Sequence, residues 1–114
     1  MTPTTHAYGP GADQFLEVTL PDGDAPAPVV VVVHGGFWRA RYGIELARPL
    51  AADLAAAGWA AVAVEYRRVG AGGGWPATLD DVAAALDSLP DLPAAARLDL
   101  SDLCLLYTSP SPRD

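Results

Sequence analysis

The chain of 114 residues has no lysine, a single cysteine and no apolar run long enough to span a bilayer. Its seven positive charges are all arginines, set against fourteen acidic residues, and the net charge is −7. Nucleic acids and anionic membranes bind clustered positive charge, so neither is an expected partner. Because Cys104 is the only cysteine, the chain can form no internal disulfide and no cysteine-based zinc site.

The first fifteen residues, "MTPTTHAYGPGADQF", also lack the basic and apolar segments of a secretory signal peptide. Together with the lone cysteine, this favours a soluble protein of the cytoplasm. The length suits one modest domain, and a hydrophobic content of 51% is enough for a packed core.

Three segments have the patterns of β-strands. In residues 15–20, "FLEVTL", apolar and other side chains alternate, which predicts a half-buried antiparallel strand with Leu16, Val18 and Leu20 on its buried side. Residues 28–33 are almost all valine, so both faces of this strand must be buried, as in a central parallel strand. Residues 59–66, "WAAVAVEY", predict a second buried strand.

Two segments have helical periodicity. The first spans residues 44–57, where Gly58 provides a C-terminal cap and Pro49 marks either a kink or the start of the helix. The second spans residues 76–89, and Asp80 and Asp81 suit the positive end of its dipole. The expected buried stripes are Leu46, Leu50, Leu54 and Ala57 in the first helix, and Leu79, Val82, Leu86 and Leu89 in the second.

A helix between two buried strands implies a βαβ unit, and therefore a mostly parallel sheet with helices on both faces. The predicted fold class is α/β. In such sheets the ligand lies beyond the carboxyl ends of the strands, where the sequence places "HGGFW", residues 34–38. Two successive glycines let the backbone turn tightly and present its N–H groups to a closely approaching group.

This motif resembles the HGG oxyanion motif of α/β-hydrolase esterases, in the branch of small carboxylesterases, feruloyl-esterase-like enzymes and kynurenine formamidases. Further segments resemble the same branch. They are "YGPGADQFLEVTLPDG", "VAVEYRR", "GWPATLDDVAAAL" and "RLDLSDL", so that the resemblance covers roughly residues 8–103.

The resemblance implies a role for each residue of the motif. The backbone N–H groups of Gly36 and Phe37 would form the oxyanion hole, with Gly35 shaping the turn. His34 would support the loop by hydrogen bonding, and Trp38 would line the substrate pocket or pack against it. No metal or other cofactor is implied.

Other candidate residues have simpler explanations. Tyr66 and Arg67 are expected to hold the end of their strand, and His6 is expected to be solvated. The glycine-rich segment 70–74 does not complete a GxGxxG motif because Trp75 replaces the last glycine, and it is interpreted as a loop.

A catalytic triad is missing from the sequence. Enzymes of this type need a serine in a G-x-S-x-G context, followed by an acid and a histidine. None of the four serines, Ser88, Ser101, Ser109 and Ser111, has that context, and both histidines precede any candidate nucleophile.

Residues 104–114, "CLLYTSPSPRD", differ in composition from the rest of the chain and resemble the one-frame translation of a transposon-end sequencing adapter. The alternative is a genuine Ser/Pro-rich linker. We therefore expect a partial α/β-hydrolase domain in residues 1–103 and a non-native tail in residues 104–114. One edge of the valine strand would then lack a partner, which favours aggregation.

Taken together, the sequence predicts the N-terminal part of a serine carboxylic-ester hydrolase that acts on a small ester or an aryl formamide. This part would carry the oxyanion loop and be inactive by itself. An oligopeptidase-like hydrolase and a non-catalytic α/β binding module are the alternatives. The oligomeric state stays open.

Overall fold

The computed structural model describes residues 3–33, 44, 47–66 and 77–107. These residues form a five-stranded mixed sheet with the strand order β1-β2-β4-β3-β5. The strands are β1 (Thr4–Ala7), β2 (Phe15–Thr19), β3 (Ala27–Val33), β4 (Ala60–Val64) and β5 (Leu98–Tyr107).

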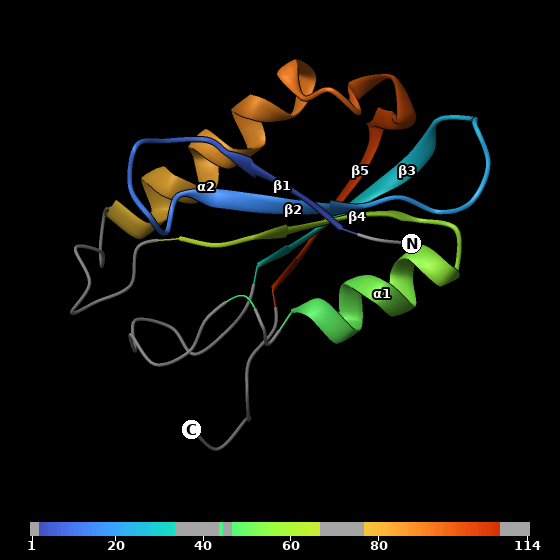
Figure 1. The fold of residues 1–114 in the computed structure, drawn as a ribbon, viewed down its shortest axis with the longest axis horizontal. Coiled ribbons are helices and arrows are strands. Elements are labelled where there is room, and N and C mark those ends of the chain that lie inside the picture. Colours follow the sequence, from blue (N-terminus) through green and yellow to red (C-terminus); the bar gives the residue numbers. More distant parts are fainter. Residues whose placement is uncertain (1–2, 34–43, 45–46, 67–76, 108–114) are drawn as a thin grey trace.

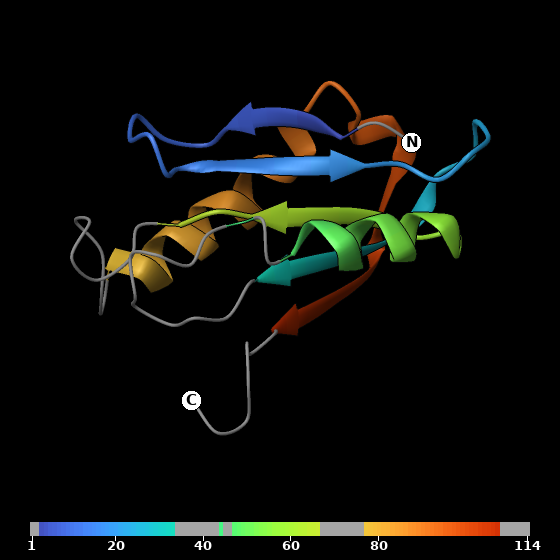
Figure 2. The same ribbon diagram turned by 60° about the horizontal axis from the view of Figure 1, so that its bottom comes forward.

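Two helices cover opposite faces of this sheet, as Figures 1 and 2 show. Helix α1 (Arg48–Ala56) connects β3 to β4, and helix α2 (Ala77–Ser88) precedes β5. Two short 3-10 helices, η2 (Leu89–Asp91) and η3 (Ala95–Arg97), lead from α2 into β5. The predicted α/β class is confirmed.

The valine run of β3 serves both faces, because successive side chains of a strand point in opposite directions. Val29, Val31 and Val33 pack in the core cluster that contains the buried side chains of α2. Val30 and Val32 pack in the smaller cluster beneath α1. All five are at most 6% exposed, so the predicted burial of both faces is confirmed.

Strand β3 has a parallel neighbour on each side, β4 and β5. The prediction that one edge of the valine strand lacks a partner is therefore wrong. Cys104–Tyr107, which the sequence assigns to the tail, lie in β5 and pair with Val30–Val33. The apolar residues Leu105 and Leu106 suit a strand, and β5 is an edge strand of the sheet with Leu103, Leu105 and Leu106 exposed.

Strand β2 pairs antiparallel with β1 and β4, as its alternating pattern predicts. Its second face is not open to solvent, however, because Glu17 is 6% and Thr19 is 4% exposed. The prediction of a half-buried strand is wrong on this face. An acid can be buried here because Arg48 of α1 pairs with it.

Helix α1 starts at Arg48 with Pro49 in its first turn, so the proline marks the start of the helix, one of the two predicted alternatives. Gly58 has a φ of +101° directly after the helix, which confirms the predicted glycine cap. The buried side chains of the helical stripe are Ala47, Ala51 and Ala55, with Leu50 and Leu54 partly buried. Ala57 is exposed, contrary to the predicted stripe, and Leu46 lies outside the described residues.

Helix α2 buries Ala85 and partly buries Val82 and Leu86, and Leu89 is buried at the start of η2. Leu79, predicted to belong to the buried stripe, is 52% exposed. The face that packs on the sheet is instead extended toward the start of the helix by Asp81, which is 1% exposed.

Candidate functional site

Three connections, β1–β2, β3–α1 and β4–α2, begin or end on the side of the sheet where the parallel strands β3 and β4 have their carboxyl ends. We call this side the carboxyl edge. Val33 ends β3 and is in register with Val64, which ends β4. Leu16, at the start of the antiparallel β2, is also in register with Val64, so the β1–β2 connection lies at this edge too. Ligands of open α/β sheets bind at such an edge.

The residues of the predicted motif, His34, Gly35, Gly36, Phe37 and Trp38, lie outside the described residues, as do Arg67 and the glycines of segment 70–74. The described part of the edge consists of the residues that flank these segments. They are Val33 and Ile44 on either side of residues 34–43, and Tyr66 and Ala77 on either side of residues 67–76.

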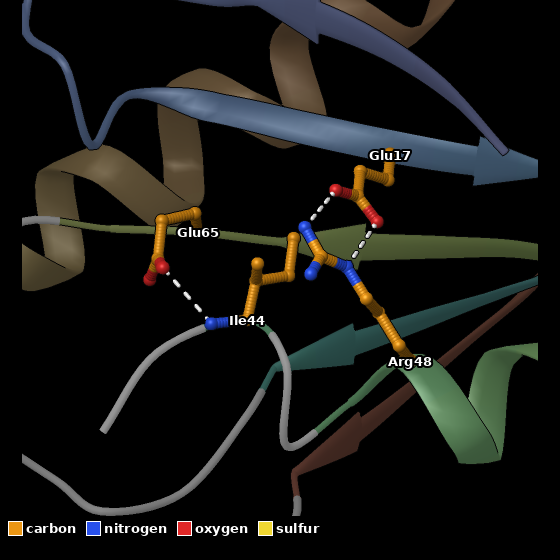
Figure 3. A network of polar contacts seen from close by, with 4 residues as sticks. All are labelled: Glu17, Ile44, Arg48 and Glu65. Atoms are coloured by element: carbon orange, nitrogen blue, oxygen red, sulfur yellow. Dashed lines mark hydrogen bonds and ion pairs between the residues drawn. The ribbon is translucent and has the colours of Figure 1, made fainter.

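Glu65, directly after β4, connects these flanking residues. Its Oε2 accepts a hydrogen bond from the backbone N–H of Ile44 at 2.9 Å, and its Oε1 accepts one from the N–H of Tyr66 at 3.1 Å. Glu65 is 4% exposed and Ile44 is 3% exposed. Figure 3 shows the carboxylate reaching from the sheet to the backbone of Ile44.

The backbone of Glu65 is held as well. Its N–H donates to the carbonyl oxygen of Phe15 in β2 at 2.9 Å. Its carbonyl oxygen accepts a hydrogen bond from the hydroxyl of Tyr8 at 2.5 Å. Tyr8 begins the β1–β2 connection, so Glu65 joins all three connections of this edge.

A second contact ties the β1–β2 connection to helix α2. The side-chain amide of Gln14 donates to Oδ1 of Asp81 at 3.0 Å, and its Oε1 accepts the N–H of Gly11 at 2.7 Å. Asp81 is therefore more than a helix-dipole residue, because its buried carboxylate receives a side chain from 67 positions earlier. Asp80, next to it, is exposed, as expected for a first-turn acid.

A second buried acid, Glu17 of β2, pairs with Arg48 at the start of α1. Nε of Arg48 donates to Oε1 of Glu17 at 3.0 Å, and Nη2 donates to Oε2 at 2.6 Å. The glutamate side chain is 8% exposed and the arginine side chain 52% exposed. This two-bond geometry fixes the first turn of α1 against the sheet (Figure 3).

A small pocket opens beside this pair, with a volume of about 220 Å³. Its polar wall consists of Glu17, Thr19 and Arg48, and the rest is proline and alanine from the N-terminus, α1 and β4. Small-molecule sites commonly occupy about 300–1,000 Å³. The carboxylate and the guanidinium group of this wall are hydrogen-bonded to each other.

Two other predicted residues lie within the described chain. Tyr66 is 1% exposed and packs in the core cluster on the α2 side, in agreement with a role at the strand end. His6 is partly exposed on β1, and its Nε2 is 3.0 Å from the hydroxyl oxygen of Thr4. Within the described ranges no three acidic, histidine or cysteine side chains are grouped to hold a metal ion. No helix of the described residues is long and apolar enough to cross a membrane.

Comparison with protein families shows the family to which the chain belongs. Residues 16–109 match the model of the family described as BD-FAE. The chain belongs to the BD-FAE family. The match begins in β2 and runs past the end of β5, so it includes every described element except β1. A search of curated proteins found no match.

Solved structures similar to this BD-FAE chain include an α/β-hydrolase and several esterases. Esterase B from Lactobacillus rhamnosis is 26% identical with a TM-score of 0.78, over 92% of this chain and 36% of that one. Esterase 2 from Thermogutta terrifontis is 20% identical with a TM-score of 0.77, over 92% and 39%. A bifunctional GH43-CE protein from Bacteroides eggerthii is 24% identical with a TM-score of 0.74, over 90% and 15%.

The BD-FAE chain thus has part of the α/β-hydrolase fold. It spans less than half the length of these structures. Of the residues at the carboxyl edge, sequence reasoning missed Glu65, Tyr8 and Gln14. One signal was present for Glu65, because it is the single charged residue in the otherwise apolar segment 59–66. Tyr8 and Gln14 carry no local signal, since their partners are distant in sequence.

Proposed function

We propose that this BD-FAE chain is the N-terminal part of a serine carboxylic-ester hydrolase and carries its oxyanion loop. The observation that carries the proposal is the position of "HGGFW" directly after Val33. This is the carboxyl end of the central parallel strand, in a fold shared with esterases.

The proposed reaction is acyl transfer through a serine supplied by the rest of the enzyme, beyond residue 103. The serine oxygen attacks the ester carbonyl carbon while a histidine accepts the hydroxyl proton. The carbonyl π bond breaks, and its electron pair forms an oxyanion. Collapse of the oxyanion expels the alcohol, which takes the proton, and water then hydrolyses the acyl-serine to the acid by the same steps.

In this proposal the backbone N–H groups of Gly36 and Phe37 donate to the oxyanion. Gly35 allows the tight turn that aims them, His34 supports the loop, and Trp38 lines the substrate pocket. Each preorganised donor at such a site contributes about 10²–10³ in rate. An aryl formamide forms the same oxyanion at its formyl carbon, so it is the second substrate class to assay.

The proposed setting is the cytoplasm, with a small-molecule ester or amide as the partner and no cofactor. The lone Cys104 supports this setting. The net charge of −7 supports a neutral small substrate over nucleic acid or an anionic membrane surface.

The test is Gly36→Val in the complete hydrolase that contains this chain, assayed with p-nitrophenyl acetate and an aryl formamide. A branched side chain displaces the donors, so kcat should fall about 10²–10³-fold while KM changes less than about 3-fold. The control is Gly23→Val in the β2–β3 turn. Gly23 has a φ of +103° with no atom within 4 Å of an added Cβ, so it reports backbone strain away from the site. A folded Gly36→Val variant with wild-type kcat would contradict the proposal.

A further inference from the structure

We propose that Glu65 is a positioning residue, whose carboxylate fixes the segment that carries the proposed oxyanion donors. The inference rests on the proposed function of residues 34–38. It goes beyond that function because it assigns the orientation of these donors to the Glu65 side chain. Glu65 directly follows the neighbouring strand β4, and its side chain contacts no substrate itself.

The first argument is that both ends of residues 34–43 are held at one place. Val33, before the segment, is in register with Val64 of β4. Ile44, after the segment, donates its N–H to the carboxylate of Glu65, the next residue along the chain from Val64. The two residues that flank positions 34–43 are therefore held by two consecutive residues, Val64 and Glu65. The sheet holds the first end, and a side chain holds the second.

The second argument is that a carboxylate is needed for this arrangement. Two backbone N–H groups, of Ile44 and Tyr66, approach separate oxygens of Glu65 at 2.9 and 3.1 Å. A glutamine has one acceptor oxygen and would turn an NH₂ group toward one of these donors. Because Glu65 and Ile44 are 4% and 3% exposed, water is a poor replacement for the lost acceptor.

The third argument is that Glu65 is rigidly placed and can therefore transmit a position. Its N–H and carbonyl oxygen are hydrogen-bonded to Phe15 and Tyr8, so strand β2 and the β1–β2 connection fix its backbone. Oxyanion donors act at about 2.7–3.1 Å from the developing charge, so a small shift of the loop lowers the rate. A shift that spares the ground-state contacts lowers kcat and leaves KM unchanged.

Glu17 provides a matched control on the same face of the sheet. It is an equally buried acid on the adjacent strand, and Ala63, two positions before Glu65, is its register partner. Its partner is the side chain of Arg48, four residues after Ile44, so its loss alters the start of α1 and spares the hydrogen bond at Ile44.

The experiment compares Glu65→Gln, Glu17→Gln and Gly36→Val in the complete hydrolase, with kcat, KM and Tm measured for each. Hydrogen exchange of peptides covering residues 34–44 is followed by mass spectrometry. Glu65→Gln should lower kcat at least 10-fold with KM within 3-fold, and exchange in these peptides should become at least 10-fold faster. Glu17→Gln should leave kcat within 3-fold even where its Tm falls.

A folded Glu65→Gln variant with wild-type kcat would overturn the inference, as would an equal loss of kcat in Glu17→Gln. Should Glu65→Gln fail to fold, Glu65→Asp takes its place. It keeps the charge and both oxygens but shortens the reach, and wild-type kcat there also overturns the inference. Gly36→Val distinguishes the proposed function from the positioning role of Glu65. Wild-type kcat in Gly36→Val refutes the proposed function. A lowered kcat in Gly36→Val together with wild-type kcat in the Glu65 variant refutes the positioning role alone.

Discussion

Glu17 and Glu65 are two buried acids on the same face of the sheet, and they are stabilised in different ways. Glu17 meets a guanidinium group whose side chain is half exposed, so its partner can return to water. Glu65 meets the backbone N–H groups of Ile44 and Tyr66, which are both buried, and a backbone donor that stays buried cannot be hydrated. We infer that the unfolding free energy lost on replacing a buried acid depends on the exposure of its partner as much as on the burial of the acid itself.

The largest expected effect follows from removing the Glu65 carboxylate. Glu65→Met keeps the side chain's volume but leaves the N–H groups of Ile44 and Tyr66 without this acceptor, at a cost of about 2–4 kcal/mol of unfolding free energy. Urea denaturation of the complete hydrolase measures this cost. If Glu65→Met and Glu17→Met lose the same unfolding free energy, the two buried acids do not differ as described.

A smaller effect, and an asymmetric one, is expected at the ion pair. Arg48→Met leaves the carboxylate of Glu17 buried without its partner and should cost about 1–3 kcal/mol. Glu17→Met removes one partner of Arg48, whose side chain is half exposed, and should cost about 0–1 kcal/mol. The same denaturation series tests this order, and a greater loss in Glu17→Met than in Arg48→Met would contradict it.

Much of the fold is predictable from local patterns. The five valines of β3 indicate a strand buried on both faces, and Pro49 and Gly58 mark the start and end of α1. These residues restrict the backbone or bury apolar surface wherever they occur, so their meaning does not depend on distant contacts.

The remaining features depend on contacts between distant segments. Leu79 follows the helical spacing but is exposed, while Asp81 is buried and receives a hydrogen bond from Gln14 of the β1–β2 connection. The four-residue β1 gives too short a pattern to recognise, and β5 was missed because residues 104–107 were assigned to a tail. The motif residues 34–38 were proposed from a family resemblance, and their roles stay predictions.

The most direct test of the central claim is covalent labelling by a fluorophosphonate probe, with p-nitrophenyl acetate hydrolysis measured in parallel. The central claim is that this chain supplies the oxyanion loop and that the nucleophilic serine lies in the rest of the enzyme. The complete hydrolase should be labelled on a serine beyond residue 103 and should hydrolyse the ester. The 114-residue chain should be neither labelled nor active, because binding cannot replace the covalent step. Labelling of any of the four serines of the 114-residue chain, together with turnover by the pure chain, would contradict the account.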